Sequence, residues 1–288
     1  MHKILVLLAL QMMMVLSACA LAVTGAQLTP GARSATAEGT SGTPASQLPG
    51  IRLTVFAAAS LTDALQAIGK QFEAVHPSVE VDFSFAGSQI LRTQLEQGAS
   101  ADVIAFADQN NMNLLISDGL VSEGVPRDCA TNQMVVILPP DNPGDVQGLI
   151  DLARPALKLV LADASVPAGT YARQILEKMS SAPNFGVDFS KKVMANVVSN
   201  ETDVRQVVTK VELGEADAGI VYTSDIQAAR DLLTIPIPPQ YNVTAHYPIA
   251  VLLDSPNPDL AVAFVNYVTS PAGEAILSEW GFSPAGIP

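Results

Sequence analysis

The sequence predicts an α/β fold, in which strands and helices alternate along the chain. Short apolar runs rich in β-branched residues, such as 51–56 and 133–138, predict buried strands. Longer segments with apolar residues three or four positions apart, such as 61–72, predict helices between those strands. Apolar residues make up 49% of the 288 residues, a share large enough to form a substantial core. Strand and helix patterns that alternate in this way are typical of α/β proteins.

The N-terminus has the layout of a bacterial export signal. A short basic region precedes the apolar run 4–16, which is too short to span a bilayer. The segment Leu-Ser-Ala-Cys at 16–19 then resembles a lipobox, so we expect residues 1–18 to be a signal peptide and Cys19 to be lipidated. Cleavage near an A-x-A site is the alternative, and it would leave Cys19 unmodified.

Residues 19–50 are expected to form the lipid anchor and a flexible tether. From residue 29 to residue 50 the chain is rich in Gly, Pro, Ser and Thr and has almost no large apolar side chains. Such a segment cannot offset its ordering entropy by burial. The ordered fold is therefore expected to begin at Ile51.

From residue 51 the expected elements alternate regularly. The helix at 61–72 is predicted by apolar residues at Leu61, Leu65, Ile68 and Phe72, which share one helical face. The elements expected up to residue 106 are strands at 51–56, 79–85 and 102–106 and helices at 61–72 and 89–96.

The same alternation resumes after residue 132 and continues almost to the C-terminus. The strands expected here are 133–138, 157–161, 192–198, 218–222 and 247–253, and the helices are 171–179, 204–213, 260–268 and 273–280. In open α/β sheets, ligands bind beyond the carboxyl ends of the strands, so the functional residues are expected where a strand leads into a helix.

The charge of the chain excludes several classes of partner. Fifteen Lys and Arg against 28 Asp and Glu give a net charge of −13, or about −14 once the signal and its single lysine are removed. This balance argues against nucleic acid, because contacts to phosphates dominate that kind of binding. Three His and two Cys leave little material for a transition-metal cation site, and no cofactor is expected.

Several strand-to-helix junctions carry residues suited to binding an anion. Ser60 and Ser88 each follow a strand and small residues, Pro167 lies in a third helix start, and Asp203 precedes a fourth. Each alone is explained by ordinary helix capping, and Ser60 with Asp63 also matches a capping box. If the four converged, their free N–H groups and helix dipoles would bind an anion without any basic side chain.

The sequence does not favour an enzyme. It contains no G-x-S-x-G elbow, no G-x-x-x-x-G-K-[ST] loop and no G-x-G-x-x-G motif. His76 and His246 have no adjacent acid that would indicate a triad, and carboxylates such as Asp163, Glu212 and Glu215 are expected to be surface charge.

Five segments together resemble the molybdate-binding proteins of ATP-binding-cassette importers. They are Val55-Phe-Ala-Ala-Ala-Ser-Leu61, Gly98-Ala-Ser-Ala-Asp-Val103 with Ala107-Asp108, Val166-Pro-Ala-Gly-Thr-Tyr171, Asp203-Val-Arg205 and Gly214-Glu-Ala-Asp-Ala-Gly-Ile-Val-Tyr222. The resemblance covers about residues 51–283. It implies the two-lobed fold of the type II periplasmic binding proteins, with a mostly parallel sheet flanked by helices in each lobe and the ligand in the cleft between them. The lobes are then expected at 51–132 plus 247–288 and at 133–246.

The resemblance also implies five ligand positions. Ser60 and Ser88 would each supply a hydroxyl and a backbone N–H, Ala168 and Val204 a backbone N–H, and Tyr222 a phenolic hydroxyl. One departure is Gly87, where close relatives often have Ser, and we expect this change to widen or loosen its loop.

The implied ligand is molybdate or tungstate, with molybdenum present only as this oxyanion. The implied partners are the importer's permease and its ATPase, and the chain is expected to act as a monomer. It would be exported and anchored by lipid to the outer face of the cell membrane, or be periplasmic. The alternatives are a binding protein for sulfate or ferric iron and, less favoured, a lipid-anchored hydrolase.

Overall fold

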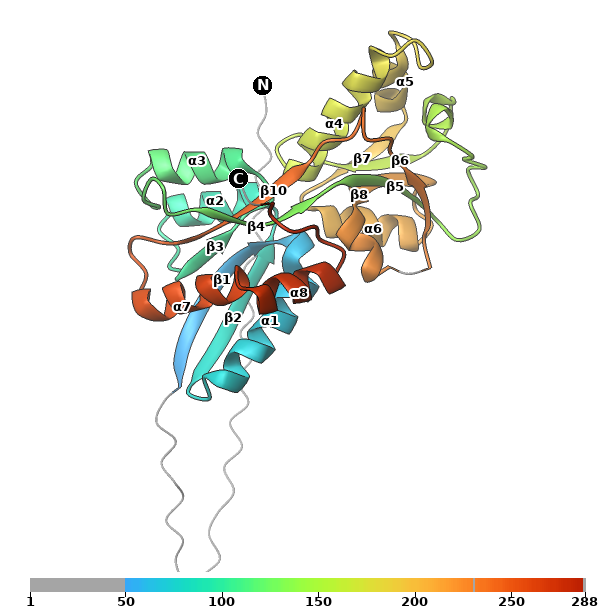
Figure 1. The fold of residues 1–288 in the computed structure, drawn as a ribbon. Helices are drawn as coiled ribbons and strands as arrows, with labels where there is room; N and C mark the ends of the chain where they lie inside the picture. Colours follow the sequence, from blue (N-terminus) through green and yellow to red (C-terminus); the bar gives the residue numbers. More distant parts are fainter. Residues whose placement is uncertain (1–49, 230, 287–288) are drawn as a thin grey trace, which may run out of the picture. The chain divides into compact units, whose positions relative to one another are not determined.

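The computed structural model describes residues 50–229 and 231–286 (Figure 1). The expected signal peptide, Cys19 and all of the expected tether except Gly50 lie outside these residues. Gly50 is exposed, and the first strand begins at the next residue.

The first sheet has the strand order β2-β1-β3-β10-β4. In this sheet β10 runs antiparallel to both of its neighbours, and the other four strands share one direction. Its strands are β1 (Ile51–Ala58), β2 (Val79–Ala86), β3 (Val103–Ala105), β4 (Arg127–Asn132) and β10 (Ala245–Val251).

The second sheet has the order β7-β6-β8-β5-β9, and here β5 alone is antiparallel to the other four. Its strands are β5 (Met134–Leu138), β6 (Leu159–Ala162), β7 (Val197–Glu201), β8 (Ala218–Tyr222) and β9 (Leu233–Pro236). The chain thus crosses from one sheet to the other between β4 and β5 and returns between β9 and β10. We call each sheet with its helices a lobe; the residue boundaries 132/133 and 246/247 stay a prediction.

Helices cover both faces of the first sheet (Figure 1). Along β1, Leu53, Val55 and Ala57 belong to one buried cluster and Phe56 to another, as the alternation of side chains along a strand requires. The first cluster includes residues of α1 (Thr62–Val75), α7 (Pro258–Val268) and α8 (Pro271–Glu279), and the second includes residues of α2 (Ser88–Glu96) and α3 (Gln109–Ser117).

The second sheet packs against α4 (Pro167–Ser180) and α6 (Val204–Glu212), and α4 in turn packs against α5 (Phe189–Ala195). Short 3-10 turns complete the structure at η1 (Ala59–Leu61), η2 (Leu149–Ala153) and η3 (Thr223–Gln227). Over residues 50–229 and 231–286, no single helix meets the length and apolarity needed to cross a membrane; α7 and α8 meet it only jointly, across a 60° bend.

Three local predictions were wrong or incomplete. The strand expected at 192–198 is the end of α5 followed by β7, because Phe189 and Val193 are four positions apart and bury one helical face. The pattern also missed α3 and β4, whose mixed polar sequences lack a clear period, and β9, which is only 4 residues long. Finally, Ser60 and Asp63 do not form a capping box, since no side chain caps α1 and Asp63 pairs elsewhere.

Candidate functional site

A small hollow lies where the ends of strands from both lobes meet. It contains no more than about 200 Å³ of empty space, below the range typical of pockets for drug-sized ligands. All five residues implied by the sequence resemblance line it, together with seven others. The lining residues are Ala58, Ala59, Ser60, Gly87, Ser88, Ala107, Val166, Pro167, Ala168, Asp203, Val204 and Tyr222.

The first lobe brings two buried serines to the hollow. The Ser60 hydroxyl in η1 lies 3.1 Å from the hydroxyl of Tyr247, whose ring is held in the core by β10. The Ser88 hydroxyl accepts a hydrogen bond of 3.1 Å from the backbone N–H of Ala107, so its own proton is free to be donated. Ser88 is also the first residue of α2, whose start has no side-chain cap. Hydroxyl and backbone donors are thus available together.

The second lobe directs two helix starts at the same hollow. Ala168 is the second residue of α4 and Val204 the first of α6, so their N–H groups have no partner within the helix. Gly169 allows α4 to begin tightly against β6, because a Cβ at this position would lie 1.9 Å from the carbonyl oxygen of Asp163. The positive ends of both helix dipoles therefore face the hollow, an arrangement that attracts anions.

Tyr222 ends β8 and carries the most unusual polar group of the site. Its side chain is 1% exposed, and its hydroxyl has no hydrogen-bond partner among the residues that the structure describes. Burial, and to a smaller extent Tyr247 and Tyr171, raises the pKa of this hydroxyl well above its ordinary value, so it stays protonated. A buried hydroxyl without a partner costs free energy, and a ligand acceptor in the hollow would remove that cost.

The hollow holds no basic side chain within the described part of the chain. Asp203 is the acidic residue of its lining, and both carboxylate oxygens are engaged at the start of α6. One accepts the backbone N–H of Gln206 at 3.1 Å and the other its side-chain N–H at 2.6 Å. The hydrogen-bond donors around the hollow are neutral hydroxyls and amides.

Gly87 has the opposite effect from the one expected. A Cβ here would lie 2.5 Å from the carbonyl oxygen of Thr202 in the other lobe and as close to the side chain of Gln89. The Gln89 side chain donates to that same carbonyl oxygen at 2.9 Å. The glycine therefore permits close contact between the lobes rather than widening the loop.

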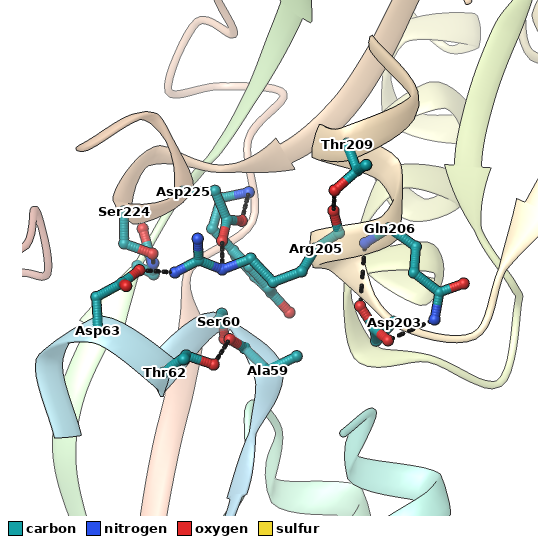
Figure 2. A network of polar contacts seen from close by, with 12 residues as sticks. Ala59, Ser60, Thr62, Asp63, Asp203, Arg205, Gln206, Thr209, Ser224 and Asp225 are labelled. Atoms are coloured by element: carbon teal, nitrogen blue, oxygen red, sulfur yellow. Dashed lines mark hydrogen bonds and ion pairs between the residues drawn. The ribbon is translucent and has the colours of Figure 1, made fainter. Parts of the chain in front are cut away.

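Charged residues lie next to the hollow, and their partners were not predicted from the sequence. Arg205, the residue after Val204, contacts Asp63 of the first lobe and Asp225 of η3 (Figure 2). Asp225 also accepts the backbone N–H of Tyr222 at 3.0 Å. Burial raises the pKa of the Asp225 carboxyl to about 7, while Arg205 opposes that rise. The motif Asp-Val-Arg pointed to this helix start, but nothing in it indicated the partners of the arginine.

Other candidate chemistry is weaker. His246 lacks an acid beside it in sequence, yet its ring lies 2.8 Å from Asp128, because β4 and β10 are neighbours. Among the described residues no serine or cysteine is hydrogen-bonded to this imidazole. In the same part of the chain no group of three or more His, Cys, Asp or Glu could hold a metal ion.

Comparison with known proteins agrees with this architecture. A model of the bacterial extracellular solute-binding proteins matches residues 53–283. The molybdate-binding protein ModA of Mycobacterium tuberculosis is 41% identical over 242 residues, which cover 83% of this chain and 88% of that protein.

Two solved structures share the fold. The periplasmic molybdate-binding protein of Azotobacter vinelandii has a TM-score of 0.70 and 21% identity, covering 82% of this chain and 99% of that one. The sulfate-binding protein SubI of M. tuberculosis has a TM-score of 0.72 and 20% identity, covering 81% and 87%. At these identities they bear on the fold alone, and they confirm the two-lobed fold that the sequence resemblance predicted.

Proposed function

The chain belongs to the family of bacterial extracellular solute-binding proteins, and from this premise we propose that it captures molybdate, or tungstate, for an ATP-binding-cassette importer. The observation that carries the proposal is the set of neutral donors around one small hollow. The buried Tyr222 hydroxyl has no partner within the described residues. The proposed ligand donors are Ser60, Ser88, Ala168, Val204 and Tyr222.

A tetrahedral oxyanion matches these donors chemically. Molybdate and tungstate at neutral pH present only acceptor oxygens, and each oxygen can accept a hydrogen bond from a hydroxyl or an amide. The helix starts add partial positive charge, which acts more strongly where water is excluded than it does in bulk water. An acidic protein can therefore bind a dianion without lysine or arginine in contact with it.

Phosphate and ferric iron fit this hollow less well. Hydrogen phosphate carries a hydroxyl that needs an acceptor, and the carboxylate in the described lining, Asp203, already accepts two hydrogen bonds from Gln206. Ferric iron needs several anionic ligands, and the described lining offers one carboxylate, Asp203, and one tyrosine, Tyr222. Sulfate has the same charge and shape as molybdate and differs in size, so the 41% identity to a molybdate-binding relative favours molybdate.

Titration calorimetry of the purified protein tests this proposal. Molybdate and tungstate are expected to bind more tightly than sulfate, and phosphate and ferric citrate are expected to bind weakly or not at all. Tighter binding of sulfate than of molybdate would overturn the assignment. If the protein bound neither molybdate nor sulfate, the result would refute the proposal that this hollow binds an anion.

We extend the proposal to the membrane and to partners. Cys19 would carry the lipid that holds the protein at the outer face of the cell membrane, and a monomer would deliver its ligand to the permease and ATPase. Palmitate labelling of the wild type and of Cys19→Ala tests the anchor, since equal labelling would exclude it. Light scattering of the purified protein tests the monomer.

A further inference from the structure

Next to the hollow, an ion pair joins the two lobes directly. Arg205 lies on α6 of the second lobe, and its guanidinium contacts the carboxylate of Asp63 on α1 of the first lobe (Figure 2). These residues are 142 positions apart in the sequence. Their side chains are 26% and 29% exposed, so solvent screens the pair only in part.

Arg205 is also held from within its own lobe. Its Nε lies 3.4 Å from Oδ1 of Asp225, a side chain with no exposure. The other oxygen of Asp225 accepts the N–H of Tyr222. The guanidinium is therefore linked through one buried carboxylate to the strand end that supplies the proposed phenolic donor.

We propose that Arg205 and Asp63 are positioning residues that hold the lobes closed around the ligand, with Asp225 keeping the guanidinium oriented on the second lobe. The inference rests on the proposed function for the identity of the ligand. Asp225 and Arg205 move together because both belong to the second lobe, whereas Asp63 separates from them when the lobes part. The pair with Asp63 is therefore an interaction of the closed state.

The charges around Arg205 show why it holds the lobes rather than the anion. The guanidinium pairs with Asp63 and contacts the Asp225 carboxyl, and Arg205 is not among the described residues that line the hollow. Neutral contacts between the lobes accompany it: Gln89 donates to Thr202, and the Tyr171 hydroxyl donates to the carbonyl oxygen of Ala107 at 3.2 Å. Among these contacts between described residues of the two lobes, the ion pair is the charged one, so salt should weaken it selectively.

The test compares Asp63→Asn with a matched control in the full-length protein. Asp82→Asn makes the same change of charge but breaks an exposed pair with Arg52, within the first lobe and 3.4 Å apart. Release of radiolabelled molybdate is measured after an excess of unlabelled molybdate is added. We expect Asp63→Asn to release it about 2- to 10-fold faster, with the association rate little changed, as is usual for broken contacts.

Salt separates this role from a merely structural one. Wild-type release should accelerate between about 0.05 M and about 0.5 M NaCl, whereas release from Asp63→Asn should respond much less. Asp63→Glu, which keeps the charge, should restore part of the slow release and its salt response. Wild-type release rates and salt response in Asp63→Asn would overturn the proposal, as would equal effects of Asp82→Asn.

A second measurement tests whether the Arg205–Asp63 pair holds the lobes closed, even if molybdate does not bind. Spin labels at Val75→Cys and Val187→Cys, exposed positions on different lobes, report the distance between the lobes, and the free Cys129 is buried. Without added anion, Asp63→Asn should shift the distances toward an open form. Identical distances in the two proteins would refute the inference, whereas absence of molybdate binding alone would refute only the proposed function.

Discussion

Replacing Tyr222 by Phe should change ligand affinity and protein stability in different directions. The substitution removes one oxygen from a side chain that is 1% exposed and leaves the ring contacts with Tyr171 and Tyr247 in place. A hydrogen bond to a charged ligand contributes about 1.5–3 kcal/mol, so molybdate should bind roughly 10- to 150-fold more weakly. Calorimetry measures this loss.

The stability of the anion-free protein should not fall. The Tyr222 hydroxyl has no partner among the described residues, so its removal breaks no internal hydrogen bond and relieves a desolvation cost of about 1–3 kcal/mol at most. The unfolding midpoint in urea should therefore stay constant or rise. Tyr267→Phe is the control, because it removes a hydroxyl on α7 that does not line the hollow and contacts Gln71 at 3.2 Å.

Two results would refute this reasoning. Unchanged molybdate affinity in Tyr222→Phe would remove the hydroxyl from the site. A marked loss of stability would mean that the hydroxyl has a structural partner in solution, and the lower affinity would then reflect a damaged fold.

Three further predictions follow from the same geometry. Ser88→Ala should lower both the affinity for molybdate and the free energy of unfolding. The unfolding free energy measured in urea should fall by about 1–3 kcal/mol, because the N–H of Ala107 loses its hydrogen-bond acceptor. An unchanged unfolding free energy would contradict the 3.1 Å hydrogen bond between Ala107 and Ser88. Gly87→Ala should weaken molybdate binding about 5- to 100-fold, because the added Cβ would lie 2.5 Å from the Thr202 carbonyl oxygen and clash with it. Wild-type affinity in this variant would show that closure of the lobes does not need the glycine. Asp225 should make the free energy of unfolding fall as pH rises from about 4 to about 7, because burial raises its pKa to about 7 and the folded state therefore binds an extra proton over this range. Urea unfolding at several pH values should show that Asp225→Asn loses this part of the pH dependence. An unaltered pH dependence in Asp225→Asn would refute the prediction.

The acidity of the chain and its proposed anionic ligand are compatible because of how the donors are arranged. Hydroxyls and helix amides act over a few ångströms, whereas the net charge of −13 acts over the whole molecule and is screened by salt. Arg205, the cation beside the site, is engaged by two carboxylates. Under the proposals above, neutral donors bind the ligand and an ion pair holds the lobes closed.

Local sequence patterns predicted most of the strands and the helix starts near the site. Ser88 and Val204 could be placed at helix starts because small or capping residues follow a strand there. The pattern failed where local and tertiary preferences differ: Asp63 matched a capping box but pairs with Arg205 instead. It also failed at His246, whose acid lies on the neighbouring strand.

By itself the sequence predicted the alternation of elements, an export signal and the free amides at helix starts, because these depend on residues within a few positions of one another. The resemblance to a known family added which five residues to consider together. Only the tertiary structure brought Ser60 to Tyr247 across 187 positions and Asp63 to Arg205 across 142. Such contacts depend on how the two sheets pack. A local sequence pattern cannot predict them, because the residues are far apart in the chain and meet only when it folds.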